Sequence, residues 1–306
     1  MMVKVLVADS IHEDGVKMMR DAGLELDLQT EITADALKKV IGGYDAIVVR
    51  SRTKLTKEVL EKSGKLKVIA RAGVGLDNVD VAYAKEKGIE VYNSPEAPSN
   101  AVAELVLGYM LDLARNISRG DHGLKQGKWL KKDLGGFELQ GKTLGIIGFG
   151  RIGYLLGKKA KALGMEVLAY DVIMDKLRHF VVEIGARDVP LDTLLAESDF
   201  VTVHVPLLPQ TRHMISAAQF NKMKKGSYII NAARGGVVDE AALKAALDAG
   251  RLAGAALDVF EQEPDPDPDL VTRHNVVCTP HIGAESEEAQ VGNSTIVAEK
   301  LIKFFK

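Results

Sequence analysis

The chain has 306 residues, of which 46% are hydrophobic and 27% are charged, a balance typical of a globular protein with two ordinary domains. The formal net charge of −2 argues against nucleic acid as a partner, and no apolar run of about eighteen residues predicts a membrane span. The single cysteine allows no intrachain disulfide, so we expect a cytoplasmic protein, and no residue cluster predicts a metal site.

The first 95 or so residues alternate short apolar runs with amphipathic stretches. This rhythm predicts a parallel β-sheet with helices on both faces. The predicted strands are 3–8, 24–28, 46–49, 66–70 and 89–92, and the predicted helices are 15–21, 34–41 and 79–87. No glycine-rich nucleotide turn follows the first run, so we expect residues 1–97 to form a small α/β domain of their own.

Two loops in this half directly follow predicted strands, where the ligands of open α/β sheets collect. Arg50, Ser51 and Arg52 come after the run 46–49, and their two guanidinium groups suit a carboxylate or a phosphate. Residues 71–75 offer backbone N–H groups that no large side chain shields, which suits an anion. Solvated arginines and a plain turn are the alternatives for each loop alone, but two such loops at one sheet edge favour an anion site.

A proline-punctuated link over 93–99 precedes a long apolar helix, predicted over 100–116 with Ser99 as its N-cap. Residues 120–141 are polar and glycine-rich, and they contain Trp129, the only tryptophan. An irregular arm of this size favours a functional or subunit-contacting loop. A surface loop with a packed tryptophan is the alternative.

The stretch 142–171 combines an apolar run, a glycine turn, a helical pattern, a second apolar run and an acid. Gly148, Gly150 and Gly153 are spaced as in a dinucleotide-binding turn, and Asp171 follows 23 positions after the first of them. The glycines allow a tight turn, close approach of a pyrophosphate and close helix packing, while the helix N-terminus attracts the phosphates. The acid would accept hydrogen bonds from the ribose hydroxyls and repel a 2′-phosphate, which favours NAD over NADP. We therefore expect a doubly wound parallel sheet of the Rossmann type.

The α/β rhythm continues to the end of the chain, with strands predicted at 200–205, 228–232, 254–259 and 275–278. Three ionisable residues, Arg234, Glu263 and His281, come just after the last three of these strands. Hydride transfer on a 2-hydroxy acid needs a base near neutrality, a carboxylate to orient it and a cation for the substrate carboxylate. Each residue alone has an ordinary structural alternative, but the trio at strand ends predicts a catalytic site.

Together these segments resemble the D-isomer-specific 2-hydroxyacid dehydrogenase family. The matching segments run in the family's order over nearly the whole chain: VVRSRTKLT, VIARAGVGLDNVD, KTLGIIGFGRIG, VTVHVPLLPQTRHMI, NAARGGVVDEAAL, AGAALDVFEQEP and TPHIGAESEEAQ. The resemblance implies that His281 is the acid/base, that Glu263 is its partner and that Arg234 anchors the substrate. It also implies a homodimer.

The resemblance further implies a flavodoxin-like substrate domain made of residues 1–97 and completed by 285–306, and an NAD-binding domain over 98–284. The backbone N–H groups of Gly73 and Val74 would bind the substrate carboxylate. Contacts with NAD are implied, besides the glycine turn, for Val74, Arg151, Ile152, Asp171, Val205, Ala232, Ala233, Arg234, Asp258, His281, Gly283 and Ala284.

The expected reaction is NAD-dependent oxidation of a small D-2-hydroxy acid. Arg50 and Arg52 favour a phosphorylated substrate, D-3-phosphoglycerate, over glyoxylate or hydroxypyruvate, whose reduction is the alternative. An NAD(H)-sensing corepressor-like protein is an alternative from another class. Family members that act on phosphoglycerate often carry a C-terminal domain that binds serine; because this chain stops at Lys306, we expect no serine feedback through such a domain.

Overall fold

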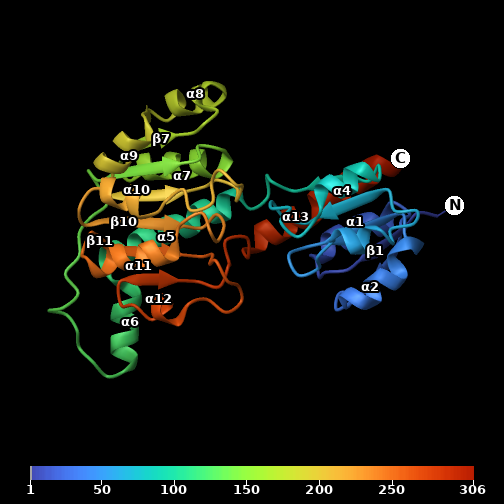
Figure 1. Cartoon of the computed structure of the whole chain (residues 1–306), viewed down its shortest axis with the longest axis horizontal. Helices are drawn as coiled ribbons and strands as arrows, with labels where there is room; N and C mark the ends of the chain where they lie inside the picture. The colour runs from blue at the N-terminus through green and yellow to red at the C-terminus, as the bar shows by residue number, and fades with distance from the viewer. Residues whose placement is uncertain (1) are drawn as a thin grey trace. The chain divides into compact units, whose positions relative to one another are not determined.

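The computed structural model describes residues 2–306 and divides into two compact units (Figure 1). Unit 1 comprises Met1–Ala101 and Ala284–Lys306, and unit 2 comprises Val102–Gly283. Each unit is a parallel β-sheet covered by helices on both faces, which confirms the predicted α/β class. No helix within residues 2–306 combines the length and the apolar character needed to cross a lipid bilayer.

The sheet of unit 1 has five strands in the order β2-β1-β3-β4-β5, the flavodoxin-like order. Its central strands are almost entirely buried, as their unbroken apolar runs predict. The strands are β1 (Lys4–Val7), β2 (Glu25–Leu28), β3 (Ala46–Val49), β4 (Val68–Arg71) and β5 (Glu90–Asn93).

Helices cover both faces of this sheet. The helices from the first half of the chain are α1 (Glu13–Asp21), α2 (Ala34–Val40), η1 (Ile41–Gly43), α3 (Lys57–Leu60) and α4 (Val81–Glu86). The final helix, α13 (Glu287–Phe305), packs on the same face as α1. The two helices approach so closely that a Cβ on Gly15 would lie 2.1 Å from Ser294 Oγ. The end of the chain therefore completes unit 1.

The sheet of unit 2 has seven strands in the order β12-β11-β10-β9-β6-β7-β8. The order reverses between β6 and β9, so the crevice that binds ligands in doubly wound sheets lies at the carboxyl ends of these two strands. The strands are β6 (Thr143–Ile147), β7 (Glu166–Tyr170), β8 (Arg187–Asp188), β9 (Phe200–Val203), β10 (Ser227–Asn231), β11 (Leu252–Leu257) and β12 (Val276–Cys278).

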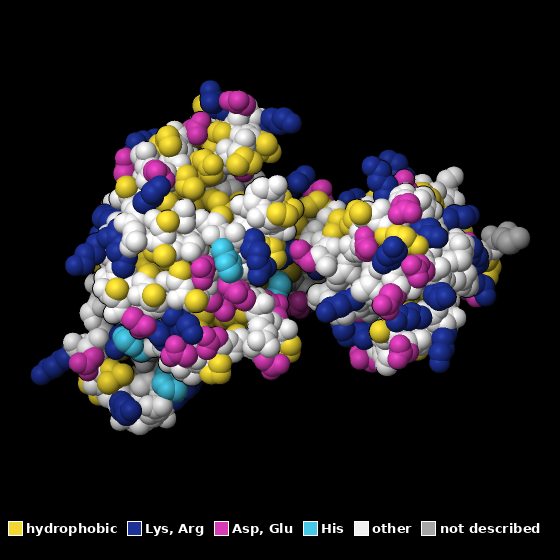
Figure 2. All heavy atoms as spheres, in the orientation of Figure 1, with side chains coloured by type: hydrophobic (Ala, Val, Ile, Leu, Met, Phe, Trp, Pro, Cys, Tyr) yellow, Lys and Arg dark blue, Asp and Glu magenta, His cyan; other side chains and the backbone are white. Residues whose placement is uncertain are grey.

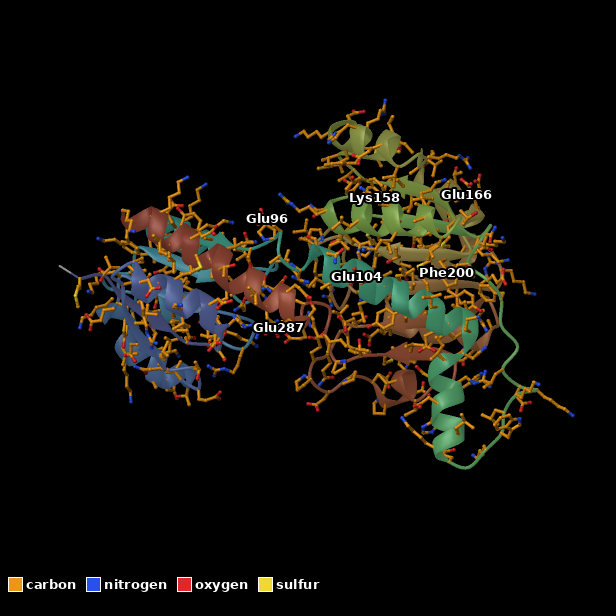
Figure 3. All side chains as sticks on the ribbon, turned by 180° about the vertical axis from the view of Figure 1, so that it is seen from behind. Glu96, Glu104, Lys158, Glu166, Phe200 and Glu287 are labelled. Carbon is orange, nitrogen blue, oxygen red and sulfur yellow. The ribbon has the colours of Figure 1, made fainter. Side chains whose placement is uncertain are left out.

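Two apolar layers hold the helices of unit 2 against its sheet. On one face lie α5 (Ser99–Arg115), α7 (Arg151–Ala162) and α8 (Met174–Glu183); on the other lie α9 (Leu191–Glu197), α10 (Ala217–Lys222), α11 (Glu240–Asp248) and α12 (Pro268–Val271). Figure 3 labels Phe200 in the sheet, where its buried ring stacks on Tyr228 with centroids 4.9 Å apart. An ion pair of 3.0 Å between Lys159 and Glu104 joins α7 to α5.

Two local predictions were wrong. Ser99 is not an N-cap, because α5 begins at Ser99 itself and its hydroxyl donates to the carbonyl of Pro95. The arm predicted over 120–141 is only partly irregular, since α6 (Ile117–Lys125) extends through its first six residues. Trp129 is 80% exposed, so the alternative of a packed tryptophan is also wrong.

Candidate functional site

The glycine turn at the end of β6 has the backbone geometry that the sequence predicts. Gly148 has φ +91°, and a Cβ there would lie 2.7 Å from the carbonyl oxygen of His204. A Cβ on Gly153 would lie 2.6 Å from the Gly148 carbonyl oxygen, so only glycine lets α7 pack this close to the turn. Around Gly150, the N-cap of α7, no atom lies within 4 Å of a built Cβ. The helix N-terminus is therefore open to a ligand and not blocked by a capping side chain.

Asp171 is fastened to this turn. It follows β7, and its carboxylate accepts hydrogen bonds from the Phe149 N–H at 2.9 Å and from the Ile173 N–H at 3.0 Å. The acid thus lies directly beside the glycine turn and stays partly exposed. An open helix N-terminus, a turn that only glycine can form and an adjacent carboxylate fit the pyrophosphate and the ribose of NAD.

His281 and Glu263 form a close pair on two loops of unit 2. His281 Nδ1 lies 2.8 Å from Glu263 Oε2, while Glu263 Oε1 accepts the Phe260 N–H at 3.0 Å. With the carboxylate ionised, Nδ1 must carry the proton of this hydrogen bond, which leaves Nε2 of the neutral ring as an acceptor. The histidine side chain is 48% exposed, so Nε2 can meet a substrate. This pair has the parts of a general base with its orienting group.

The loop that carries His281 is organised by Asp258, which is 1% exposed. The Asp258 carboxylate accepts the N–H groups of Ile282 and Gly283, both at 2.8 Å, and the Thr279 hydroxyl. Its carbonyl oxygen accepts the His281 N–H at 2.8 Å, and His281 itself has φ +56°. Asp258 therefore holds the histidine backbone in a left-handed conformation that it would otherwise avoid. The sequence did not reveal this role, and its NAD contact stays a prediction.

Arg234 lies on the loop after β10, which packs directly against the loop of Glu263. The Asn231 side chain holds this loop by donating to the Arg234 carbonyl at 3.0 Å and accepting the Ala233 N–H at 3.1 Å. A Cβ on Gly235 would lie 1.7 Å from the Phe260 carbonyl oxygen, so the two backbones meet with no room for a side chain. The loops of Arg234 and Glu263 are thus neighbours in unit 2.

The remaining predicted cofactor residues lie in both units. Arg151 and Ile152 begin α7, Val205 follows β9, and Ala232 and Ala233 follow β10. Gly283 ends unit 2, whereas Val74 and Ala284 belong to unit 1. No sequence pattern singles out His204, which also follows β9. Burial lowers the pKa of its imidazole to about 4, so the ring is neutral at physiological pH.

The predicted arginine loop of unit 1 is held mainly by its own fold. Buried Asp9 accepts the Arg50 N–H at 2.6 Å and the Thr53 N–H at 3.1 Å, and it forms an ion pair of 3.0 Å with Arg52. The Arg52 guanidinium also donates to three backbone carbonyl groups, those of Ala8, Thr30 and Ile32. The Arg52 N–H groups are therefore hydrogen-bonded within unit 1, which weakens the prediction that Arg52 faces a phosphate.

Arg50 and Ser51 remain at the surface of this loop. The Arg50 guanidinium pairs with Glu285 at 2.7 Å, and its side chain is 26% exposed. Ser51 is exposed. Because the Glu285 side chain is 49% exposed, the ion pair is solvated and can exchange for another anion. Arg50 is thus the member of the predicted phosphate site that can reach a ligand.

In the second predicted anion loop, residues 71–75, some backbone groups are already hydrogen-bonded within unit 1. Gly73 has φ +142°, and its N–H donates to Ser94 Oγ at 2.7 Å, so its expected contact with the substrate carboxylate stays a prediction that competes with this bond. The carbonyl of Val74 accepts the Asn93 side chain at 2.7 Å, while no acceptor within residues 2–306 is assigned to the Val74 N–H. Val74 keeps a donor for a carboxylate.

An open glycine turn with its acid, together with a histidine–carboxylate pair on the same sheet, defines a dinucleotide-binding protein equipped for proton transfer. A model of the NAD binding domain of the D-isomer specific 2-hydroxyacid dehydrogenases matches residues 107–283. The chain belongs to this family, and its cofactor is NAD.

Individual relatives cover the whole chain. It is 49% identical to D-3-phosphoglycerate dehydrogenase of Methanocaldococcus jannaschii over 100% of the chain and 58% of that protein. It is 46% identical to hydroxypyruvate reductase of Thermotoga maritima over 98% of the chain and 97% of that protein. The structure of Aquifex aeolicus D-lactate dehydrogenase, complexed with NAD and lactic acid, superposes with a TM-score of 0.85 at 31% identity, covering 99% of this chain and 95% of that one. The chain thus spans about 58% of the first phosphoglycerate dehydrogenases that it matches.

Proposed function

We propose that the protein oxidises D-3-phosphoglycerate to 3-phosphohydroxypyruvate with NAD, the first step of serine biosynthesis. The observation that carries this proposal is the hydrogen-bonded pair of His281 and Glu263 on the NAD-binding sheet. Relatives from several organisms that match 97% or more of this chain bear the name D-3-phosphoglycerate dehydrogenase, which supports this substrate.

In the proposed mechanism His281 is the general base. Its Nε2 accepts the proton of the C2 hydroxyl, since Nδ1 is already committed to Glu263 at 2.8 Å. When bound, NAD supplies the acceptor for the C2 hydride. Glu263 stabilises the imidazolium that results, and the Phe260 N–H keeps the carboxylate pointed at the ring. In the reverse direction the same imidazolium returns the proton to the carbonyl oxygen.

We further propose that Arg234 binds the substrate carboxylate; the contact expected of the Val74 N–H in unit 1 stays a prediction. A guanidinium can form two parallel hydrogen bonds with a carboxylate and fix its orientation. The Gly73 N–H is left out of this proposal because it is bonded to Ser94 Oγ. At the phosphate end we assign Arg50 alone, since Arg52 is bonded to the carbonyls of its own loop.

Reduction of hydroxypyruvate is the second candidate, and a specific observation favours it. Of the two arginines expected to select a phosphate, Arg52 is committed and Arg50 is paired with Glu285. Arg50 alone, which must first break its ion pair with Glu285, would bind a phosphate weakly. The Thermotoga maritima relative that matches at nearly full length is named hydroxypyruvate reductase.

The test compares kcat/KM for 3-phosphohydroxypyruvate and hydroxypyruvate with NADH, and for D-3-phosphoglycerate with NAD. Our proposal requires a preference for the phosphorylated acid and a loss of that preference in Arg50→Ala. Arg20→Ala, which removes an exposed arginine from α1 in the same unit, is the matched control. Equal rates on both keto acids in all three proteins would favour the reductase. NADH binding without turnover of any of these acids would instead favour the corepressor-like alternative.

A further inference from the structure

The segment before α10 is joined to the Arg234 loop by a short strand-like pairing. The His213 N–H donates to the Gly236 carbonyl at 2.7 Å, and the Ile215 N–H donates to the Val237 carbonyl at 3.3 Å. The Asp239 N–H returns to the Ile215 carbonyl at 2.9 Å. This segment is thus bonded along the outgoing half of the loop that follows β10.

The side chain of His213 reaches the other catalytic loop. His213 Nε2 lies 3.0 Å from Glu261 Oε1, two residues before Glu263. Glu261 is bound a second time, since its N–H donates to Glu240 Oε1 at 2.7 Å and its carboxylate accepts the Glu240 N–H at 3.2 Å. His213 has φ +51°, which the two-sided pairing holds in place. Figure 2 shows histidine and acidic side chains gathered on this face of unit 2.

The imidazole of His213 lies among these acids. Its Nδ1 lies 4.0 Å from Asp239 Oδ2, so the ring stands between two carboxylates. Burial raises the pKa of the Glu240 carboxyl, and the neighbouring Glu261 carboxylate raises it further. Without His213 the acids at the base of both loops would lose a shared partner, and the Glu261 carboxylate would keep the longer bond of 3.2 Å to the Glu240 N–H.

We propose that His213 is a positioning residue for the reaction: it locks the Arg234 loop to the Glu263 loop, so that guanidinium and imidazole act on one substrate in fixed register. Its backbone holds the first loop at Gly236 and its ring holds the second at Glu261. A Cβ on Gly235 would overlap the Phe260 carbonyl, so the two loops are in direct backbone contact. A shift of Glu261 would therefore displace the neighbouring Phe260 N–H, which orients Glu263. This inference rests on the proposed hydride transfer.

The kinetic test uses the full chain with NAD and D-3-phosphoglycerate, or with NADH and hydroxypyruvate if that is the substrate turned over. His213→Ala should lower kcat about tenfold, the order expected from a small misplacement of catalytic groups, while KM for the nucleotide stays within about twofold. His213→Gln, whose amide N–H can still donate to Glu261, should recover most of the loss. His122→Gln is the matched control, because His122 is exposed and, in residues 2–306, its ring hydrogen-bonds only to Gln126, the residue that caps the same helix.

A second readout does not depend on turnover. In protein labelled with [15N]histidine and free of nucleotide, the Nδ1 proton of His281 should give a downfield NMR signal from its bond to Glu263. That signal should broaden or disappear in His213→Ala and persist in His213→Gln. An unchanged signal and unchanged kcat in a folded His213→Ala protein would overturn the inference. Loss of the signal without turnover in wild type would support the positioning role and reject the proposed function instead.

Discussion

Replacing Glu263 by glutamine tests the acid–base pair with the smallest change in shape. The carboxylate accepts two hydrogen bonds, from His281 Nδ1 at 2.8 Å and from the Phe260 N–H at 3.0 Å. An amide has only one oxygen, so one of the two donors must face an NH₂ group that cannot accept. The variant therefore either releases the imidazole or releases the loop, and it also removes the charge that stabilises the imidazolium.

The magnitude follows from these contacts. A hydrogen bond to a charged group contributes about 1.5 to 3 kcal/mol. The two side chains are 48% and 37% exposed, so water partly replaces what is lost and the lower end applies. About 1.5 kcal/mol corresponds to roughly a tenfold fall in kcat. KM for NAD should hardly change, because Glu263 lies on the loop after β11 and not on the glycine turn.

The assay is the steady-state rate of NADH formation, with Asp265→Asn as control. Asp265 is an exposed acid on the same loop, so its replacement removes the same charge without touching the histidine. A Glu263→Gln enzyme within twofold of wild type, or an equal loss in the control, would refute the assignment of Glu263 as the partner of His281.

Two further predictions concern stability. Gly15→Ala should destabilise the fold by about 1 to 3 kcal/mol, because the new Cβ would lie 2.6 Å from the backbone oxygen of Ser294, whereas Gly108→Ala should stabilise it by about 1 kcal/mol, because nothing lies within 4 Å of that helical position. Urea unfolding measures both, and changes of the same sign would contradict the close approach of α1 and α13. Burial lowers the pKa of His204 from the ordinary 6.5 to about 4. As the pH falls from 6.5 to 4, His204 therefore binds a proton in the unfolded chain but not in the folded protein, which favours unfolding. Between pH 7 and pH 4.5 the free energy of unfolding of wild type should therefore fall by roughly 2 to 3 kcal/mol more than that of His204→Gln. Equal decreases in the two proteins would contradict the prediction.

The architecture could be predicted from the sequence because its signals are local. Apolar runs of four or five residues, such as 46–49, separated by amphipathic stretches, specify buried parallel strands without knowledge of their partners. The glycine turn at 148–153 is recognisable locally from its spacing, although the atom that a Cβ on Gly148 would meet is the His204 carbonyl oxygen, fifty-six residues later. The sequence did not predict α3, α12 and β8, which have four residues or fewer, too few for a periodic pattern to stand out, nor the longer helices α6 and α8.

The hydrogen bonds of the functional loops were harder to predict than the fold. The sequence shows which polar groups follow a strand, but it does not show which atoms they bond to. Arg50 and Arg52 have the same chemistry one residue apart, yet Arg52 turns to carbonyls at 8, 30 and 32 while Arg50 faces Glu285. These bonding partners are far away in the chain, and no sequence pattern around residue 52 predicts them. Nothing near Gly73 in the sequence shows that its N–H is bonded, yet a serine twenty-one residues later accepts it.

Both units hold their ligand loops by the same physical means. In unit 1 a buried aspartate after β1, Asp9, accepts the N–H groups of Arg50 and Thr53 from the neighbouring strand's loop. In unit 2 a buried aspartate after β11, Asp258, accepts those of Ile282 and Gly283. A carboxylate that is nearly inaccessible to water is tolerable only when several donors satisfy it, so each aspartate imposes one conformation on the loop beside it.

This explains why the loops can carry strained and exposed groups without losing their geometry. His281 adopts φ +56° and leaves its Nε2 to solvent because Asp258 has already fixed the peptide groups on either side of it. The buried acid supplies rigidity, and in the proposed mechanism the exposed imidazole supplies the chemistry. Removing Asp258 should therefore cost activity through the orientation of His281, even though the aspartate takes no part in proton transfer. In a sequence the two kinds of acid look alike, since both Asp258 and Glu263 follow one strand within six residues, and only burial separates the anchor from the proposed partner of His281.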